Sequence, residues 1–400
     1  MRLNELEKLA KRRRLDAVLV CAEPNILALT GVRCDNAVLV GKVGRWEGGK
    51  VERWESGKVG KGESEKVGRL TGGVTGKGVA WALHTDFRYV PMVHRIAPDL
   101  DCRDLKELKI RGRRIGYESS IPHAQFLKFQ KLAPRGATFV DVADDLLAIR
   151  AVKTPDEIAK IRAAEALTCK IWRTASARFR AGMTERDMAR IIQKLMIEKG
   201  EGEAFGTIVC VGKNAAECHH EPDDTVWNGR EPVLVDMGVR LGGVCGDLTR
   251  NLVPGLSPTP QRPNIQTPKH PNLQPPKLPN IQTSKLYRQV YALVAEANRA
   301  AIAAAKPGMT GKALDKVARD VIAKGGFGKC FGHSLGHGVG YEIHEAPVAS
   351  PKSDTVLKPG MCVTIEPGIY LEGNLGVRIE DLVLITETGC EVLSEMRGRP

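Results

Sequence analysis

Residues 233–253 read VLVDMGVRLGGVCGDLTRNLV, and this stretch decides how the C-terminal part of the chain is expected to fold. It predicts an apolar strand that ends at Asp236, a glycine-rich turn, and a second strand that begins near Asp247 and returns beside the first. Taken alone, Asp236 is explained by a strand-end cap and Asp247 by a local ion pair with Arg250. However, burial of a carboxylate in an apolar strand is costly unless a cation compensates its charge, so both residues are candidate metal ligands.

Three later stretches each contain one further candidate ligand: His337 in HSLGHGVG, Glu366 in VTIEPG and Glu380 in GVRIEDLVLIT. The histidine lies among glycines, which allow a close approach of the backbone. The first glutamate is expected at the end of an apolar strand, and the second inside the next strand. Each of them alone also fits a loop, a turn or a solvated edge. Four carboxylates and one imidazole together suit two hard divalent cations that share bridging oxygens.

The composition limits the class of protein. With 400 residues, of which 42% are hydrophobic and 27% charged, the chain has material for two domains, which excludes a small stapled scaffold and a disordered protein. The ten cysteines form no CxxC pair, so we expect reduced thiols. No run approaches the ~20 apolar residues of a membrane span, and the first apolar run is too short for a signal peptide. We therefore expect a cytoplasmic location and no membrane partner.

Two low-complexity segments, about 41–80 and 257–285, contain tandem units of eight residues such as GKVGRWEG and PNIQTPKH. They carry 8 of the 13 excess positive charges of the chain. Neither segment has the apolar content of a core, so we expect two solvated inserts rather than domains. Because most of the excess charge lies in these inserts, we expect no specific nucleic-acid partner.

The remaining sequence predicts an α/β protein of two domains. Short alternating elements fill residues 1–148, and a capping box that starts at Thr154 opens a long helix early in the second domain, residues 149–400. The tripeptide Gly-Met-Thr occurs at 182–184 and again at 308–310, each time before a helix and a glycine. This recurrence indicates an internal duplication of the second domain.

The motifs VDMG, GDLTR, HSLGHGVGYEIHE, VTIEPGIY and GVRIEDLVLI resemble, in this order, those of the pita-bread metallopeptidases, the Xaa-Pro aminopeptidases and Xaa-Pro dipeptidases. DFRY, IGYES and AVKTPDEIAKIR resemble their creatinase-like N-terminal domain. The resemblance implies a small creatinase-like domain followed by an internally duplicated pita-bread α/β domain. It also implies two divalent ions, Mn²⁺ first and Co²⁺ or Zn²⁺ as alternatives. Asp236 would bind one ion, His337 and Glu366 the other, and Asp247 and Glu380 both.

The same resemblance assigns roles to flanking residues. The residues implied in catalysis are His219, His344 and Glu366, and those implied in substrate binding are His333, Tyr370 and Arg378. Cys218 stands where the family usually has a proline, and His220 follows, so His220 is the alternative to His219. The implied partners are a proline-containing peptide as substrate and further copies of the chain in a homodimer or larger homo-oligomer.

The expected activity is hydrolysis of Xaa-Pro bonds at the N-terminus of peptides, that is, an aminopeptidase. Two metal ions can hold one water between them and lower its pKa, which gives a hydroxide nucleophile near neutral pH. The alternatives are an Xaa-Pro dipeptidase, or prolidase, and an inactive peptide-binding module of the same fold. A methionine aminopeptidase does not need residues 1–148, and creatinase uses the fold without metal ions, so both are disfavoured.

Overall fold

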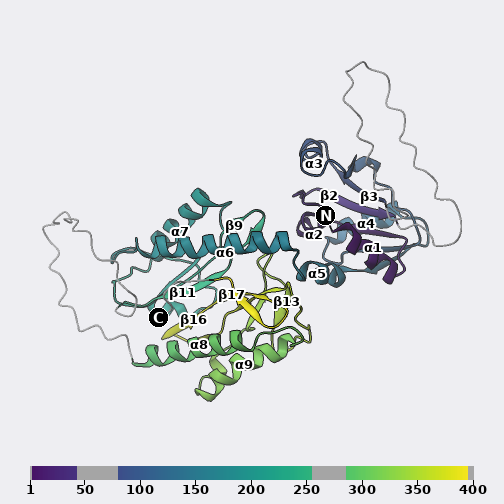
Figure 1. Ribbon diagram of the computed structural model, residues 1–400. Helices are drawn as coiled ribbons and strands as arrows, with labels where there is room; N and C mark the ends of the chain where they lie inside the picture. The colour runs from purple at the N-terminus through teal and green to yellow at the C-terminus, as the bar shows by residue number, and fades with distance from the viewer. Residues whose placement is uncertain (1, 43–79, 255–284, 395–400) are drawn as a thin grey trace. The chain divides into compact units, whose positions relative to one another are not determined.

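The computed structural model describes residues 2–42, 80–254 and 285–394. The chain divides into two compact units, Met1–Arg150 and Ala151–Pro400 (Figure 1). Both expected inserts lie almost wholly outside the described residues. Within the described part of the chain, no helix is long and apolar enough to cross a membrane.

The N-terminal unit contains a six-stranded mixed sheet with the strand order β4-β3-β2-β1-β5-β6. All four residues of the strand β1 are buried, because Val18 and Val20 pack on one face of the sheet and Leu19 on the other. The strands are β1 (Ala17–Val20), β2 (Ala37–Lys42), β3 (Ala80–Thr85), β4 (Asp101–Asp104), β5 (Arg114–Tyr117) and β6 (Thr138–Asp141). The helices are α1 (Leu3–Arg12), α2 (Glu23–Thr30), α3 (Val90–Ile96), η1 (Leu105–Glu107), α4 (His123–Leu132) and α5 (Ala143–Ala151).

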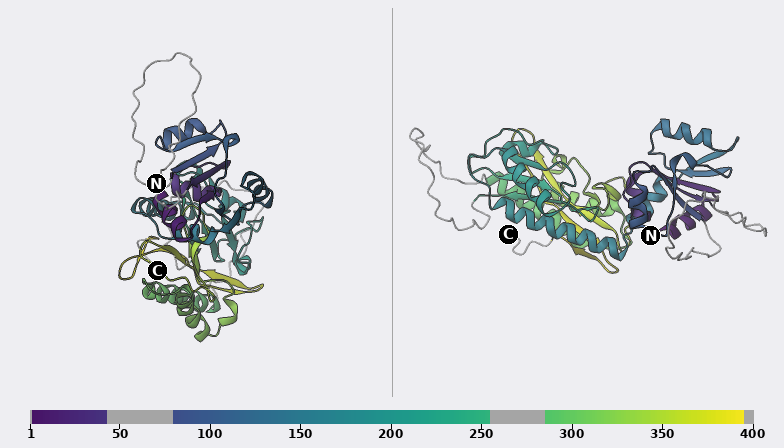
Figure 2. Two further views of the ribbon diagram at one scale, coloured as in Figure 1. Left: turned by 90° about the vertical axis from the view of Figure 1, so that its right-hand side faces the viewer. Right: turned by 90° about the horizontal axis from the view of Figure 1, so that it is seen from above.

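The C-terminal unit consists of two halves that share a common series of elements, to which the second half adds two strands. Each half contributes two helices, a sheet in which an antiparallel pair of strands forms the centre, and a small hairpin between those two strands. Figure 1 shows the strands between the α6–α7 pair and the α8–α9 pair, and Figure 2 gives two further views of these layers. The prediction of an internally duplicated pita-bread α/β domain is therefore confirmed.

The first half contains α6 (Pro155–Ser176), α7 (Glu185–Lys199), β7 (Ile208–Val211), η2 (Gly212–Ala216), β8 (Val233–Met237), β9 (Arg240–Leu241), β10 (Val244–Cys245) and β11 (Leu248–Leu252). The second half contains α8 (Lys285–Ala304), α9 (Gly311–Lys324), η3 (Gly328–Cys330), β12 (Gly336–Gly338), β13 (Glu345–Ala349), β14 (Cys362–Ile365), β15 (Gly368–Leu371), β16 (Leu375–Arg378), β17 (Asp381–Ile385) and β18 (Cys390–Val392). The sheet orders are β11-β8-β7 and β13-β12-β14-β17-β18.

The two Gly-Met-Thr segments occupy equivalent positions in the two halves. Thr184 and Thr310 are the N-caps of α7 and α9, and each forms an isolated bridge to a later segment, at Val226 and Val356 respectively. The glycine two residues before each threonine has a positive φ, 93° at position 182 and 83° at position 308. A residue with a side chain would be strained in this backbone conformation. The repeated tripeptide thus reflects repeated backbone geometry.

Two expectations need correction. Glu380 does not lie inside a strand but between β16 and β17, because its backbone N–H bonds to the carbonyl of Thr249 in β11 rather than within its own sheet. The first insert was expected to begin at residue 41, but Gly41 belongs to β2. The ring of Trp81 on β3 crosses its backbone, so that a Cβ at Gly41 would lie 2.1 Å from it.

The strands β2 and β3 form an antiparallel pair that runs from Ala37↔Thr85 to Lys42↔Ala80. We therefore predict that replacing residues 43–79 with Asn-Gly, a pair suited to a two-residue hairpin turn, preserves the fold. The midpoint of thermal unfolding should equal that of the wild type or exceed it. Each halving of the loop length lowers the entropic free-energy cost of closing the loop by about 0.6 kcal/mol. Circular dichroism would measure this, and loss of cooperative unfolding would contradict it.

Candidate metal centre

The five candidate ligands come from strand ends in both halves of the C-terminal unit. Asp236 lies in β8, Asp247 directly before β11, His337 in β12, Glu366 directly after β14 and Glu380 directly before β17. His337 Nε2 lies 3.3 Å from Glu366 Oε1 and 3.6 Å from Asp247 Oδ2. One ligand atom each of Asp247, His337 and Glu380 lies within 4.8 Å of the other two. The fold thus gathers these side chains in one cluster.

Close packing of β12 against β14 places His337 in this cluster. A Cβ at Gly336 would lie 1.9 Å from the carbonyl oxygen of Thr364, so only glycine permits this approach. Thr364 Oγ1 accepts a hydrogen bond from the His337 N–H (3.0 Å) and donates one to Glu366 Oε1 (3.2 Å). One threonine therefore sets the relative position of two candidate ligands.

The carboxylates of the cluster repel one another. Burial, followed by the charges of Glu380 and Asp236, raises the pKa of Asp247 well above its ordinary value. Burial, followed by Glu366 and Asp236, does the same to the pKa of Glu380. The pKa of Glu366 is lowered instead, because its hydrogen bond to His337 and the charge of that imidazole outweigh the effect of burial. The His337 imidazole and the Arg378 guanidinium together cannot offset four ionised carboxylates, so the cluster favours a bound cation.

Asp236 gives the most direct sign that a cation fits. Its Oδ2 accepts a hydrogen bond from Arg378 Nη2 (2.7 Å), whereas its Oδ1 is buried and accepts none from the described residues. Buried polar atoms are almost always satisfied by a hydrogen bond or an ion. The donor set of carboxylate oxygens and one imidazole is the set expected for hard divalent ions.

His333, Tyr370 and Arg378 form a chain of hydrogen bonds beside the carboxylates. Arg378 Nη1 donates to the Tyr370 hydroxyl (2.9 Å), whose own proton is then directed to His333 Nε2 (2.9 Å). His333 Nδ1 faces the carbonyl of Ser334 (2.8 Å), so Nδ1 carries a proton, and a hydroxyl that donates to Nε2 requires the neutral form of the ring. Burial lowers the pKa of His333, in agreement with this form.

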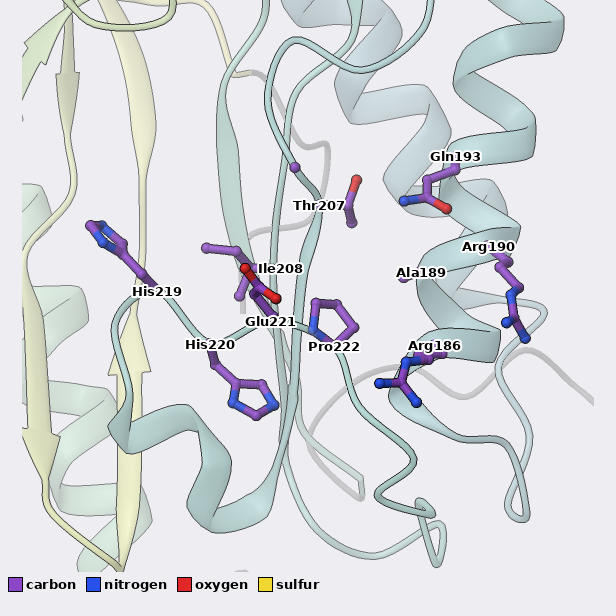
Figure 3. Close-up of a pocket in the computed structure, with 11 residues that line it drawn as sticks. Arg186, Ala189, Arg190, Gln193, Thr207, Ile208, His219, His220, Glu221 and Pro222 are labelled. Atoms are coloured by element: carbon purple, nitrogen blue, oxygen red, sulfur yellow. The ribbon is translucent and has the colours of Figure 1, made fainter.

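Neighbouring histidines differ in what they face. The ring of His344 meets the ring of His337 edge-on, with centroids 4.3 Å apart. Burial lowers the pKa of His344, and the charges of His337 and, to a smaller extent, His219 lower it further. His220 instead contacts Glu185 and Glu217 through its two ring nitrogens. In Figure 3 the side chains of His219 and His220 point in different directions. His219 is thus close enough to His344 to affect its pKa, whereas His220 is held by the two glutamates.

A pocket of about 530 Å³ lies beside the segment that carries both histidines. Residues of α7, among them Arg186 and Arg190, form one wall, and residues 219–222 form another (Figure 3). His219 lines this pocket as well, so it connects the pocket with the surroundings of His344.

Comparisons with known proteins agree with this geometry. The profile of metallopeptidase family M24 matches residues 159–387. The Xaa-Pro dipeptidase of Lactobacillus helveticus is 39% identical over 277 residues, which cover 69% of this chain and 68% of that protein. The Xaa-Pro dipeptidase of Pyrococcus furiosus is 35% identical over 293 residues, which cover 73% of this chain and 76% of that protein.

The chain belongs to metallopeptidase family M24.

Solved structures support the assignment over nearly the full length. The prolidase of Pyrococcus horikoshii superposes with a TM-score of 0.79 at 28% identity and covers 99% of this chain and 98% of its own. The X-Pro aminopeptidase of Thermotoga maritima superposes with a TM-score of 0.73 at 28% identity, with coverages of 97% and 98%. Membership of family M24 implies divalent metal ions, and the carboxylate cluster offers candidate ligands for them.

Several residues around the carboxylate cluster are not predicted from the sequence. Thr249 Oγ1 donates to Glu380 Oε2 (2.8 Å) and accepts from Arg378 Nε (3.1 Å). Glu165 on α6 is fully buried and accepts a hydrogen bond from the backbone N–H of Asp247 (2.8 Å). The signal for Glu165 was an acidic residue on the apolar face of a helix, whereas Thr249 becomes visible only when the register of β8 and β11 is known.

We predict that Asp247→Asn lowers the stability of the fold when Mn²⁺ is bound and does not lower it when metal is absent. At a Mn²⁺ concentration of 100 times Kd, the ion should stabilise the wild type by about 2.7 kcal/mol, and Asp247→Asn should lose most of this gain. In EDTA, Asp247→Asn should unfold at the same temperature as the wild type or higher, because it removes one of the repelling charges. Differential scanning calorimetry measures both. Glu391→Gln, at an exposed carboxylate paired with Arg162, is the control and should change neither. A variant that binds Mn²⁺ as tightly as the wild type would contradict the assignment of Asp247.

Proposed function

We propose that this M24 metallopeptidase is an Xaa-Pro dipeptidase, or prolidase, that hydrolyses the peptide bond before proline with the help of two divalent ions. The observation that carries the proposal is the convergence of Asp236, Asp247, His337, Glu366 and Glu380, with His219 and His344 beside them. The aminopeptidase activity expected from the sequence gives way to the dipeptidase alternative, because the curated relatives described above are named Xaa-Pro dipeptidases.

Asp236 is proposed to hold one ion, His337 and Glu366 the other, and Asp247 and Glu380 both. When bound, such ions polarise the substrate carbonyl and lower the pKa of a water that attacks it. Mn²⁺ is the proposed ion, with Co²⁺ or Zn²⁺ as alternatives, because the donor set is mostly carboxylate oxygen.

The chain's own side chains then act on charge and protons. His219 and His344 are proposed to donate hydrogen bonds to the carbonyl oxygen as negative charge develops there. The lowered pKa of His344, due to burial and to His337, keeps its imidazole neutral near pH 7 with one N–H to donate. Glu366, whose pKa is also lowered, remains ionised and can accept a proton at a carboxylate oxygen and pass it to the leaving prolyl nitrogen.

His333 and Tyr370 are proposed to line the space for the proline ring. Arg378 was expected to contact the substrate, but its side chain is only 4% exposed and its guanidinium contacts Asp236, Thr249 and Tyr370. We therefore propose that Arg378 positions Asp236 and Tyr370 instead of touching the peptide. A homo-oligomeric assembly and a cytoplasmic location stay predictions from the sequence.

An X-Pro aminopeptidase is the second candidate, because that of Thermotoga maritima shares the fold over nearly the whole chain. We predict that, with Mn²⁺ bound, kcat/KM for Gly-Pro exceeds that for Gly-Pro-Ala at least tenfold, and that Gly-Ala is not cleaved. His219→Gln should lower kcat for Gly-Pro about 100-fold, the usual effect of removing one donor to a developing oxyanion. Release of free proline, followed by a ninhydrin assay, measures the dipeptide reaction.

Faster cleavage of Gly-Pro-Ala would establish the aminopeptidase instead. Turnover of neither peptide by protein with demonstrated bound metal would refute the peptidase and support the inactive binding module.

A further inference from the structure

A buried ion pair joins Glu185 to His220, the residue that follows His219. Glu185, the first residue of α7, is fully buried, and its Oε2 lies 2.7 Å from Nε2 of His220. The other ring nitrogen of His220, Nδ1, lies 3.1 Å from Oε2 of Glu217. Burial alone would lower the pKa of His220, but its contacts with Glu185 and Glu217 outweigh burial and raise the pKa, which favours the imidazolium that donates to both carboxylates.

Glu185 also binds the backbone on both sides of His219. Its Oε1 accepts hydrogen bonds from the Val211 N–H (2.6 Å) and from Asn214 Nδ2 (3.0 Å), and its Oε2 accepts one from the Asp223 N–H (3.1 Å). One carboxylate thus fixes the end of β7, the turn after it and the chain just beyond His220.

Glu185, His220 and Asp223 lie close enough together to resemble a metal site. However, the bonds from Val211, Asn214, His220 and Asp223 occupy the four acceptor positions of the Glu185 carboxylate. The group is a closed hydrogen-bond network that fixes the backbone, and it offers no vacant oxygen to a cation.

The second half of the C-terminal unit repeats this arrangement with different residues. Glu345 directly follows His344, and its carboxylate is paired with Lys153 Nζ, with side chains only 1% and 3% exposed. In both halves, the residue after one of the two histidines assigned to catalysis is held in an ion pair with a buried charged side chain. Such a repeat is the pattern expected if the pair fixes the direction of the histidine beside it.

We propose that the Glu185–His220 pair is a positioning device that directs His219 toward the substrate carbonyl. It acts on the proposed Xaa-Pro hydrolysis, on which this inference rests, through His219 alone. Neither Glu185 nor His220 touches the substrate. Loss of the pair therefore lowers the rate of the chemical step and leaves substrate binding nearly unchanged, because misplacement of a group by about 1 Å is enough to slow a reaction strongly.

Two substitutions of similar size separate the contacts of His220. In His220→Gln the amide nitrogen occupies the place of Nε2 and keeps the bond to Glu185, whereas in His220→Asn it occupies the place of Nδ1 and keeps only the bond to Glu217. For Gly-Pro with saturating Mn²⁺, we expect His220→Asn to lower kcat about tenfold with KM changed less than about twofold. His220→Gln should retain most of kcat.

A second arm asks whether the effect passes through His219. In a His219→Gln background, adding His220→Asn should cause no further loss of kcat. The control is Asp187→Ala, which removes the side-chain oxygen that accepts the Thr184 N–H in the capping box of the same helix and should lower the unfolding temperature without changing kcat. Equal activities of His220→Asn and His220→Gln, or the same fold loss with and without His219, would overturn the inference.

A third arm does not need turnover. With ¹³C-labelled histidine in the metal-free protein, the ring signals of His219, assigned with His219→Gln, should shift in His220→Asn and not in His220→Gln. Unshifted signals in His220→Asn would overturn the inference. If the wild type leaves Gly-Pro intact but the His219 signals still shift in His220→Asn, the proposed function is refuted and the positioning role is supported.

Discussion

The rest of the structure depends on one electrostatic constraint: four carboxylates and a single imidazole lie together at one buried site. Left to themselves, such charges would move apart or take up protons, as the raised pKa values of Asp247 and Glu380 show. The fold holds them there with hydrogen bonds from both halves of the C-terminal unit. Thr249 in β11 reaches Glu380 of the other half, and Arg378 in β16 reaches Asp236 of the first. Arg378 and His337 offset part of this negative charge, and divalent cations of the kind that family M24 uses would balance the rest.

The duplication explains how such a cluster arises from segments far apart in the sequence. Asp247 and Glu380 occupy matching positions, each one residue before the strand that returns from the small hairpin. Likewise, His219 follows β7 and His344 follows β12, the strands that flank the central pair in each half. Both copies of the unit thus contribute candidate ligands to one cluster, and in the proposed reaction each copy also supplies one histidine.

The sequence predicted those parts of the structure that depend on local pattern. Apolar strands that end in acidic residues indicated the candidate ligands, and the repeated Gly-Met-Thr indicated the duplication, since both are set by neighbours in the chain. The position of Glu380 was wrong because a contact with β11, remote in the sequence, decides where its strand begins. Thr249, Glu165 and Glu185 were missed for the same reason: each acts on a residue that only the tertiary structure brings close.

The hairpin of β2 and β3 has a consequence for how this chain can vary. Its register is fixed by the pairs from Ala37↔Thr85 to Lys42↔Ala80, whatever length of chain connects the two strands. A slip of one residue within a strand would exchange its two faces, but a change of length beyond the last pair causes no slip. Eight-residue units at this point can be gained or lost as whole blocks of eight codons while the sheet stays the same. The connection between β2 and β3 is therefore a place where the number of eight-residue units can change without any change in the register of the sheet.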